Sequence, residues 1–215
     1  MLNKITIQNR YLIPLIEDLM DQLKGSKYFN NIDLKSSYHQ VPIEPFDVWN
    51  TSFQSKEGHF EWLIMPFGLT NSHTNSMQLM DDILRPFTNL YVVLYLGNIL
   101  IFRHSWEDHI HHIWQVLQIL RQHKLCVNLE KCTFGMTKVQ YLGHIINEWG
   151  VHVNLAKIKV IRYWPAPTTL TELCKFLGLA NFYCRFMLGF SHITQRLSEV
   201  TKGRVKENFF WYESQ

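Results

Sequence analysis

The sequence predicts an α+β fold, a sheet covered by helices on one face. Segments with the helical spacing of apolar residues interleave with short runs of β-branched and aromatic residues. Interleaved helices and non-adjacent strands favour a layered fold of this kind. Apolar residues make up 47% of the 215 residues and aromatic residues 14%, which is enough for a sizeable core and excludes a disordered chain.

Five segments are predicted as helices from their apolar spacing and from residues that begin or end helices. They are residues 14–23, 71–84, 106–123, 155–163 and 169–186. Gly25 ends the first helix and Pro86 the second, and Thr169 with Glu172 forms a capping pattern at the start of the last. The third is amphipathic, with an apolar face made by Ile110, Ile113, Trp114, Leu117 and Leu120.

Strands are predicted at residues 28–34, 50–53, 59–64 and 139–146, the last with Gly143 inside it. The second and third form a hairpin through Lys56-Glu57-Gly58. The strongest strand signal is residues 91–102, where two β-branched and aromatic runs flank Gly97-Asn98. This pattern predicts a β-hairpin with a tight two-residue turn at Gly97-Asn98.

Composition limits the classes of function. A net charge of +3 permits a nucleic-acid partner without arguing for one. The four cysteines lack Cys-x-x-Cys spacing, so a zinc site is not expected. The N-terminus carries no secretion signal, which leads us to expect an intracellular protein with reduced thiols. No window reaches the ~18 consecutive apolar residues of a membrane span, so no membrane partner is expected.

Five motifs in a fixed order carry a resemblance to a known family. They are Leu2 to Tyr11, Asp33-Leu34-Lys35-Ser36-Ser37-Tyr38-His39-Gln40, Met65-Pro66-Phe67-Gly68-Leu69-Thr70-Asn71, Tyr141-Leu142-Gly143-His144 and Phe176 to Tyr183. From about residue 2 to residue 211, the chain resembles the reverse transcriptase, or RNA-directed DNA polymerase, of Ty3/gypsy-type long-terminal-repeat retrotransposons. The resemblance implies a fragment of a polyprotein without the upstream fingers strands, protease, RNase H and integrase.

By this resemblance the fold is the palm of a right-hand polymerase with part of the fingers, the thumb and the start of the connection. Residues 1–150 would form the partial fingers and palm, and residues 151–215 the thumb and the beginning of the connection. The Pro-rich step at residues 164–167 is the best internal boundary in the sequence. Pro66, Phe67 and Gly68 match the family's template grip, and Leu142, Gly143 and His144 match its primer grip.

The resemblance also implies a catalytic site with two metal ions, Mg²⁺ or Mn²⁺, held by three carboxylates. Asp33 matches the first carboxylate, while Gly97 and Asn98 occupy the two positions of the family's Tyr-x-Asp-Asp motif. Glycine offers no side-chain ligand, and the asparagine amide cannot offset the charge of a cation. We therefore expect weak metal binding or none at Asp33, and polymerase activity near zero.

Further departures from the family surround this motif. After Asn71 the family has Ala-Pro-Ala-Thr-Phe-Gln, whereas this chain has Ser72-His73-Thr74-Asn75-Ser76-Met77. The family's glutamine contacts the incoming nucleotide, and Met77 cannot form the same hydrogen bonds. Ser37 stands where the family has glycine, and Tyr38 keeps the nucleotide-binding position that discriminates against ribose 2′-hydroxyls.

Several of these residues have simpler interpretations. Asp33 alternatively caps the end of a strand, and Tyr38 is alternatively a packed aromatic residue. Asp81 and Asp82 are the nearest alternative carboxylates, but an exposed helix face explains them better. The His109-x-x-His112 pattern does not complete a set of metal ligands.

Basic residues on the expected thumb offer backbone affinity for nucleic acid, with a solvated charged face as the alternative. These are Lys124, Lys131, Lys138, Lys157 and Lys159. The leading hypothesis is a retrotransposon-derived domain that no longer polymerises and retains binding to an RNA/DNA primer-template or to a protein. The alternatives are an active polymerase with an unusual metal site and a structural subunit paired with an active polymerase.

Overall fold

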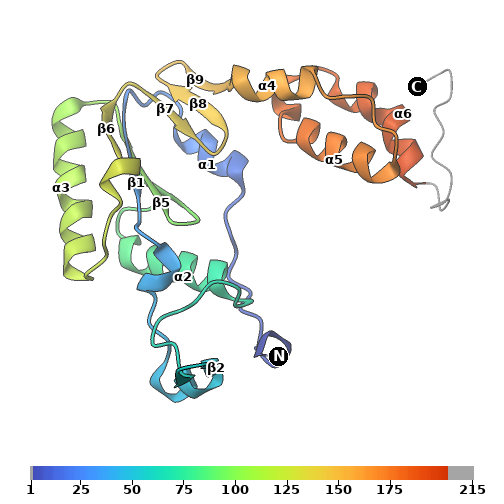
Figure 1. The fold of residues 1–215 in the computed structure, drawn as a ribbon. Helices are drawn as coiled ribbons and strands as arrows, with labels where there is room; N and C mark the ends of the chain where they lie inside the picture. The colour runs from blue at the N-terminus through green and yellow to red at the C-terminus, as the bar shows by residue number, and fades with distance from the viewer. Residues whose placement is uncertain (1, 203–215) are drawn as a thin grey trace. The chain divides into compact units, whose positions relative to one another are not determined.

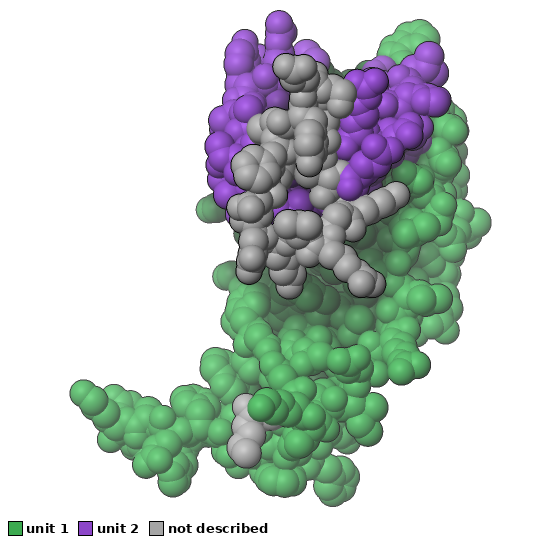
Figure 2. All heavy atoms as spheres, turned by 90° about the vertical axis from the view of Figure 1, so that its right-hand side faces the viewer, with its two compact units in different colours: residues 1–142, 146–151 green, residues 143–145, 152–215 purple. Residues whose placement is uncertain are grey.

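A computed structural model of the chain describes residues 2–202. The chain divides into two compact units, residues 1–142 with 146–151 and residues 143–145 with 152–215, which Figure 2 shows in different colours. The assignment of residues 1–150 to fingers and palm, and of residues 151–215 to thumb and connection, stays a prediction. The end of the second range, residues 203–215, lies outside the described residues.

Six α-helices and nine strands are described (Figure 1). The helices are α1 Ile16–Gln22, α2 Ser72–Leu84, α3 Trp106–Gln122, α4 Leu155–Arg162, α5 Leu170–Asn181 and α6 Phe190–Lys202. The strands are β1 Tyr28–Asp33, β2 Phe53–Ser55, β3 Gly58–Phe60, β4 Val92–Tyr95, β5 Asn98–Arg103, β6 Thr133–Met136, β7 Lys138–Tyr141, β8 His144–Asn147 and β9 Gly150–Val153. Short 3-10 helices are η1 Leu2–Lys4, η2 Ser37–Gln40, η3 Pro45–Thr51, η4 Leu129–Lys131 and η5 Cys184–Phe186.

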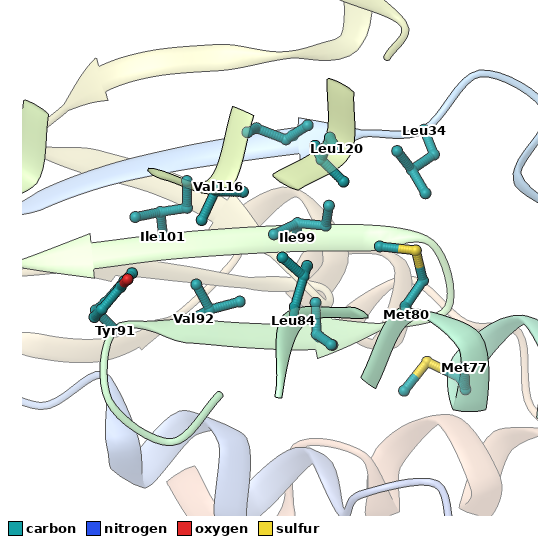
Figure 3. Close-up of a cluster of buried hydrophobic side chains, with 12 residues drawn as sticks. Leu34, Met77, Met80, Leu84, Tyr91, Val92, Ile99, Ile101, Val116 and Leu120 are labelled. Carbon is teal, nitrogen blue, oxygen red and sulfur yellow. The ribbon is translucent and has the colours of Figure 1, made fainter. Parts of the chain in front are cut away.

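A four-stranded sheet in the order β4-β5-β1-β6 forms the centre of the first unit. Side chains alternate along β5, so Ile99 and Ile101 pack on one face while Leu100 and Phe102 pack on the other. On the first face, α2 and α3 cover the sheet (Figure 3). On the second face, α1, β7 and β8 cover it. The α+β class is confirmed, but helices cover both faces of this sheet, because the strands are apolar on both sides.

The boundaries of several predicted elements were wrong. Residues 139–146 form two strands rather than one, since Leu142 and Gly143 turn the chain between β7 and β8. In the predicted strand at residues 50–53, residues 50 and 51 belong to the 3-10 helix η3 and only Phe53 belongs to a strand, β2. The predicted helix 169–186 ends as α5 at Asn181. Strands β6 and β9 were not predicted, because each has only four residues and carries little periodic signal. Helix α6 was also not predicted, although its sequence has a clear amphipathic pattern.

The buried face of α3 also differs from the predicted one. Leu120 is buried as predicted and Ile113 packs against the core, but Ile110 and Trp114 are 50% and 58% exposed. His109 and Val116, outside the predicted face, are buried instead. A pattern based on hydrophobicity excludes histidine, but His109 lies in the interior because its Nε2 is 2.8 Å from the Asn30 Oδ1 atom of β1. The buried face therefore begins with a polar residue.

In the second unit, helices α4 to α6 pack in the order of the sequence, and Leu173 of α5 is fully buried. No helix within residues 2–202 is long and apolar enough to cross a bilayer.

Candidate functional site

The turn of the β4–β5 hairpin is Leu96-Gly97, one residue earlier than predicted. Tyr95 pairs with Asn98, so Asn98 is the first residue of β5 rather than part of the turn. Leu96 and Gly97 have φ values of 45° and 87°, the positive pair expected of a type I′ turn. The buried residues on both strands set this register, because a shift by one residue would turn every side chain to the opposite face.

Asp33 lies at the end of β1, directly opposite Asn98 of β5. The backbone fixes this position, since the Leu34 N–H donates to the Gly97 carbonyl at 3.3 Å and the Asn128 N–H donates to the Asp33 carbonyl at 2.8 Å. Directly opposed residues in an antiparallel pair have Cβ atoms about 4.5–5.5 Å apart. The fold thus brings together Asp33, Gly97 and Asn98, the three positions that the resemblance assigns to carboxylates, and only Asp33 is a carboxylate.

The charged neighbour of Asp33 is a lysine. The Lys131 Nζ atom, at the end of η4, is 4.0 Å from the Asp33 Oδ1 atom, and the Asp33 side chain is 23% exposed. An ammonium group beside a single carboxylate leaves no excess negative charge for a divalent cation. Within residues 2–202 no three His, Cys, Asp or Glu side chains gather into a possible metal site. The residues present do not fit the two-metal site that the family uses.

The alternative carboxylates on α2 serve another purpose. Asp81 and Asp82 both form ion pairs with Arg85 one turn further along the helix. Tyr11 also bonds to Asp81, and burial together with this carboxylate raises the pKa of Tyr11 to about 12. Asp81 therefore links α2 to the N-terminal segment through Tyr11, and both acids pair with Arg85 at the C-terminal end of the helix.

Tyr38, the expected nucleotide-binding residue, is held by a side chain that the family lacks. Its hydroxyl oxygen lies 2.5 Å from the Nδ1 atom of His73, in the first turn of α2. Its ring also makes an edge contact with Phe67, at 5.3 Å between centroids. Burial raises the pKa of the Tyr38 hydroxyl, so this group stays neutral. The Tyr38 hydroxyl is therefore already hydrogen-bonded to His73.

Met77 does not line an open nucleotide site. Its side chain is 2% exposed and packs in the cluster with Met80 and Leu84 of α2, where Figure 3 shows all three against the sheet. The Leu96 N–H donates to the Met77 Sδ atom at 3.0 Å. The position that would contact an incoming nucleotide thus supports the hairpin turn instead.

Of the residues matching the template grip, Phe67 contacts Tyr38. Phe67 is 66% exposed, and the Gly68 carbonyl accepts a hydrogen bond from the Asn3 side chain at 2.7 Å. Pro66 is half-buried. The structure therefore brings Phe67 close to Tyr38, with its ring directed partly to solvent.

The residues matching the primer grip form a second turn. Leu142 and Gly143 have φ values of 46° and 78° between β7 and β8. His144 is buried, and its ring stacks on Phe182 at 4.9 Å between centroids. Burial, with a smaller effect of Arg185, lowers the pKa of His144. Because His144 is enclosed, only the turn itself is accessible here.

His109 and His112 of α3 each have a partner in the sheet, Asn30 of β1 and Arg103 of β5. Burial, followed by the nearby His112, lowers the pKa of His109 to about 4. His112 accepts a hydrogen bond from Arg103 at 3.1 Å and stacks on Tyr91 at 3.7 Å between centroids. These contacts account for the His-x-x-His pattern as part of the packing between α3 and the sheet.

Sequence reasoning gave no spatial role to two residues beside the turn. Ser37 was noted only for its departure from the family, and Lys131 only as one of several basic residues. Ser37 lies against Gly97, and Lys131 lies against Asp33. No periodic pattern reports such contacts, since each joins segments that are distant in the sequence.

Comparison with known proteins identifies the family. Residues 1–146 match the family described as reverse transcriptase (RNA-dependent DNA polymerase). The chain belongs to the reverse transcriptase family. This reverse transcriptase-like chain is 36% identical over 205 residues to the Retrovirus-related Pol polyprotein from transposon 297 of Drosophila melanogaster. It is 34% identical over 202 residues to that from transposon gypsy of the same organism and 34% identical over 205 residues to the Transposon Tf2-7 polyprotein of Schizosaccharomyces pombe.

The alignments cover 94–95% of this chain and only 15–20% of these polyproteins. Among solved structures, the foamy viral protease-reverse transcriptase dRH in complex with double-stranded DNA superimposes with a TM-score of 0.89 at 24% identity, covering 99% of this chain and 37% of that one. The same viral protein in complex with an RNA/DNA hybrid gives a TM-score of 0.84 at 24% identity, with 99% and 29% covered. The predicted family and polymerase fold are confirmed.

Proposed function

We propose that this reverse transcriptase-like domain does not polymerise and retains binding to nucleic acid. The observation that carries the first part is the pairing of Asp33, the one carboxylate at the site, with Lys131 at 4.0 Å and opposite Asn98. Two-metal catalysis needs both ions to stabilise the attacking and leaving oxygens. A site with a single carboxylate beside an ammonium group cannot compensate the charge of two divalent ions.

The nucleotide position supports the same conclusion. Tyr38 is bonded to His73, and Met77 is buried beneath the turn. Met77 is buried in the core cluster and its thioether already accepts from the Leu96 N–H, so it cannot offer an incoming nucleotide the hydrogen bonds of a glutamine. Loss of the metal ligands and loss of the nucleotide contact therefore coincide at one turn.

Retained binding to nucleic acid rests on the fold and on surface charge. The foamy viral reverse transcriptase, which has the same fold, has been solved in complex with an RNA/DNA hybrid and with double-stranded DNA. The five basic residues noted in the sequence are all exposed, namely Lys124, Lys131, Lys138, Lys157 and Lys159. Contacts of this kind bind the phosphate backbone without need of metal ions and weaken with salt.

A primer-extension assay with Mn²⁺, the more permissive metal, tests the proposed loss of activity. We expect no template-dependent incorporation above that of the Asp33→Ala variant. Incorporation by the natural chain that Asp33→Ala abolishes would show an active polymerase with an unusual metal site. Titration with a fluorescent primer-template at several salt concentrations tests the retained binding, and no binding at low salt would exclude it.

A second candidate function is that of a subunit that binds another protein. Large apolar side chains around η3 favour it, since Phe46 and Trp49 are 85% and 65% exposed and Leu63 is 71% exposed. Exposed apolar patches of this kind occur at protein interfaces. Co-purification followed by native mass measurement tests it, and a chain that stays monomeric and alone counts against it.

A further inference from the structure

The space beside Gly97 is occupied by a neighbouring side chain. A Cβ atom added to Gly97 would lie 2.9 Å from the Ser37 Oγ atom and 3.1 Å from the Ser37 Cβ atom. Rotation about the Cα–Cβ bond moves the hydroxyl away but leaves the Cβ atom in place. A side chain at position 97 thus requires the backbone at residue 37 or at residue 97 to move.

Neither backbone segment is free to move away from the other. Gly97 accepts a hydrogen bond from the Leu34 N–H at 3.3 Å, three residues before Ser37. The chain next to Ser37 is held by the Lys35 N–H, which donates to the Cys126 carbonyl at 2.9 Å. On the other side of the turn, Met77 accepts from the Leu96 N–H at 3.0 Å. The turn and the start of η2 are therefore held against each other.

The backbone of the turn adds a second restriction. Gly97 has a φ of 87°, a conformation that residues with a Cβ atom rarely adopt. A residue other than glycine at this position meets both the side chain of Ser37 and an unfavourable φ. The position of Ser37 is thus compatible with glycine, and not with a larger residue, at the second position of the turn.

We infer that Ser37 is a positioning residue that fixes the Leu96-Gly97 turn in a form with no room for a side chain, so that acids restored at positions 97 and 98 do not by themselves rebuild a metal site. The inference rests on the proposed function, in which the missing ligands belong at these two positions. The inference goes beyond that function because a residue outside the hairpin, Ser37, keeps the turn in a form that excludes an acidic side chain at position 97. Restoring metal binding then requires Ser37→Gly as well.

The test measures Mn²⁺ binding by its effect on water proton relaxation. It compares the double variant Gly97→Asp/Asn98→Asp with the same double variant carrying Ser37→Gly. We expect the triple variant to bind Mn²⁺ about 10- to 100-fold more tightly, the range typical of residues that orient metal ligands. The matched control is Ser37→Ala in the double variant, which removes the hydroxyl and keeps the Cβ contact at 3.1 Å. We expect it to recover much less affinity than Ser37→Gly.

Thermal unfolding in metal-free buffer provides a second measurement that does not depend on binding. The triple variant should melt at a higher temperature than the double variant, because it removes the contact at residue 97. Equal Mn²⁺ affinity of folded double and triple variants, whether tight or absent, would overturn the inference. That outcome would leave the inactivity of the natural chain untouched, since primer extension by the natural chain tests it separately.

Discussion

Two hairpins of this chain turn on the same dipeptide, and only one of them keeps the sequence of the family. Leu96-Gly97 joins β4 to β5, and Leu142-Gly143 joins β7 to β8. Their φ values are nearly identical, 45° and 87° in the first turn and 46° and 78° in the second. By the resemblance, the second turn matches the family's primer-grip motif, whereas the first has Gly97 and Asn98 where the Tyr-x-Asp-Asp motif has its acids.

The neighbours of the two glycines also correspond. A Cβ atom on Gly97 would meet Ser37 at 2.9 Å, and one on Gly143 would meet the Phe182 ring at 3.2 Å. Each turn is thus fitted to a glycine by a side chain from another segment. At both turns, glycine is therefore required by the backbone conformation and by a neighbouring side chain. The first turn, which has no acidic side chains, meets the same structural requirement as the second.

The strands that carry the first turn should be far more sensitive to substitution than exposed positions. Ile99 is fully buried in the cluster beneath α2 and α3. We expect Ile99→Ala to lower the free energy of unfolding by about 2–5 kcal/mol, the usual cost of a large cavity in a core. Ile110→Ala, at a half-exposed position of α3, is the control and should cost much less. Urea denaturation measures both, and similar losses would mean that the sheet is not a packed scaffold.

Acid should weaken the scaffold below the first turn through His109. Its pKa is about 4 in the folded chain against an ordinary 6.5, since burial disfavours the charged form. The unfolded chain therefore takes up a proton first, so stability is complete above about pH 6.5 and falls as the pH drops toward 4. The loss from this residue amounts to about 3 kcal/mol.

Denaturation at a series of pH values checks this loss. His109→Gln keeps a group that can donate to Asn30 and cannot titrate, so its stability should fall less steeply over the same range. The half-buried His112 and the buried His144 contribute in the same direction and remain in both proteins. Parallel pH profiles of the natural chain and the variant would contradict the assignment.

The two turns should respond alike to the loss of their glycines. Gly97→Ala and Gly143→Ala each place a Cβ atom at a positive φ and near a neighbour, and we expect a cost of about 1–3 kcal/mol for each. Gly178→Ala in α5 is the control, because no atom lies within 4 Å of the added carbon, and there alanine should stabilise the helix. Thermal unfolding compares the three variants. If Gly97→Ala left the melting temperature unchanged while Gly143→Ala lowered it, the two turns would not share the same requirement for glycine.

The ion pair at Asp33 should contribute least to stability. The Lys131 side chain is 67% exposed and its Nζ atom is 4.0 Å from the carboxylate. Exposed pairs of this kind contribute about 0–1 kcal/mol. We expect Lys131→Gln to change the unfolding midpoint no more than Lys138→Gln, which alters an exposed lysine on β7. A larger loss with Lys131→Gln would show that Asp33 depends on this partner.

Much of this molecule was predictable from local sequence. The strand at Tyr28 to Asp33, the hairpin around residue 97 and the helices α2 and α3 follow from apolar runs and their end signals. The turn was misplaced by one residue because a Gly-Asn pair is itself a strong turn signal. Only the pairing of Tyr95 with Asn98 shows that Asn98 belongs to the strand.

The interior of the site was less accessible to sequence reasoning. The resemblance identified Asp33, Gly97 and Asn98 as one site, but no local pattern places Ser37 against the turn or Lys131 against Asp33. Similarly, His109 looks like a polar surface residue until its partner Asn30 is known. Contacts between polar groups distant in the sequence have no periodicity, so only the folded structure reveals them.

The central claim is that the hairpin scaffold persists while the metal site is gone. The most direct measurement is the Mn²⁺ enhancement of water proton relaxation with the natural chain and with its Asp33→Asn variant, both shown to be folded by circular dichroism. The account predicts the same weak enhancement for both proteins. Tight Mn²⁺ binding by the natural chain that Asp33→Asn removes would contradict it.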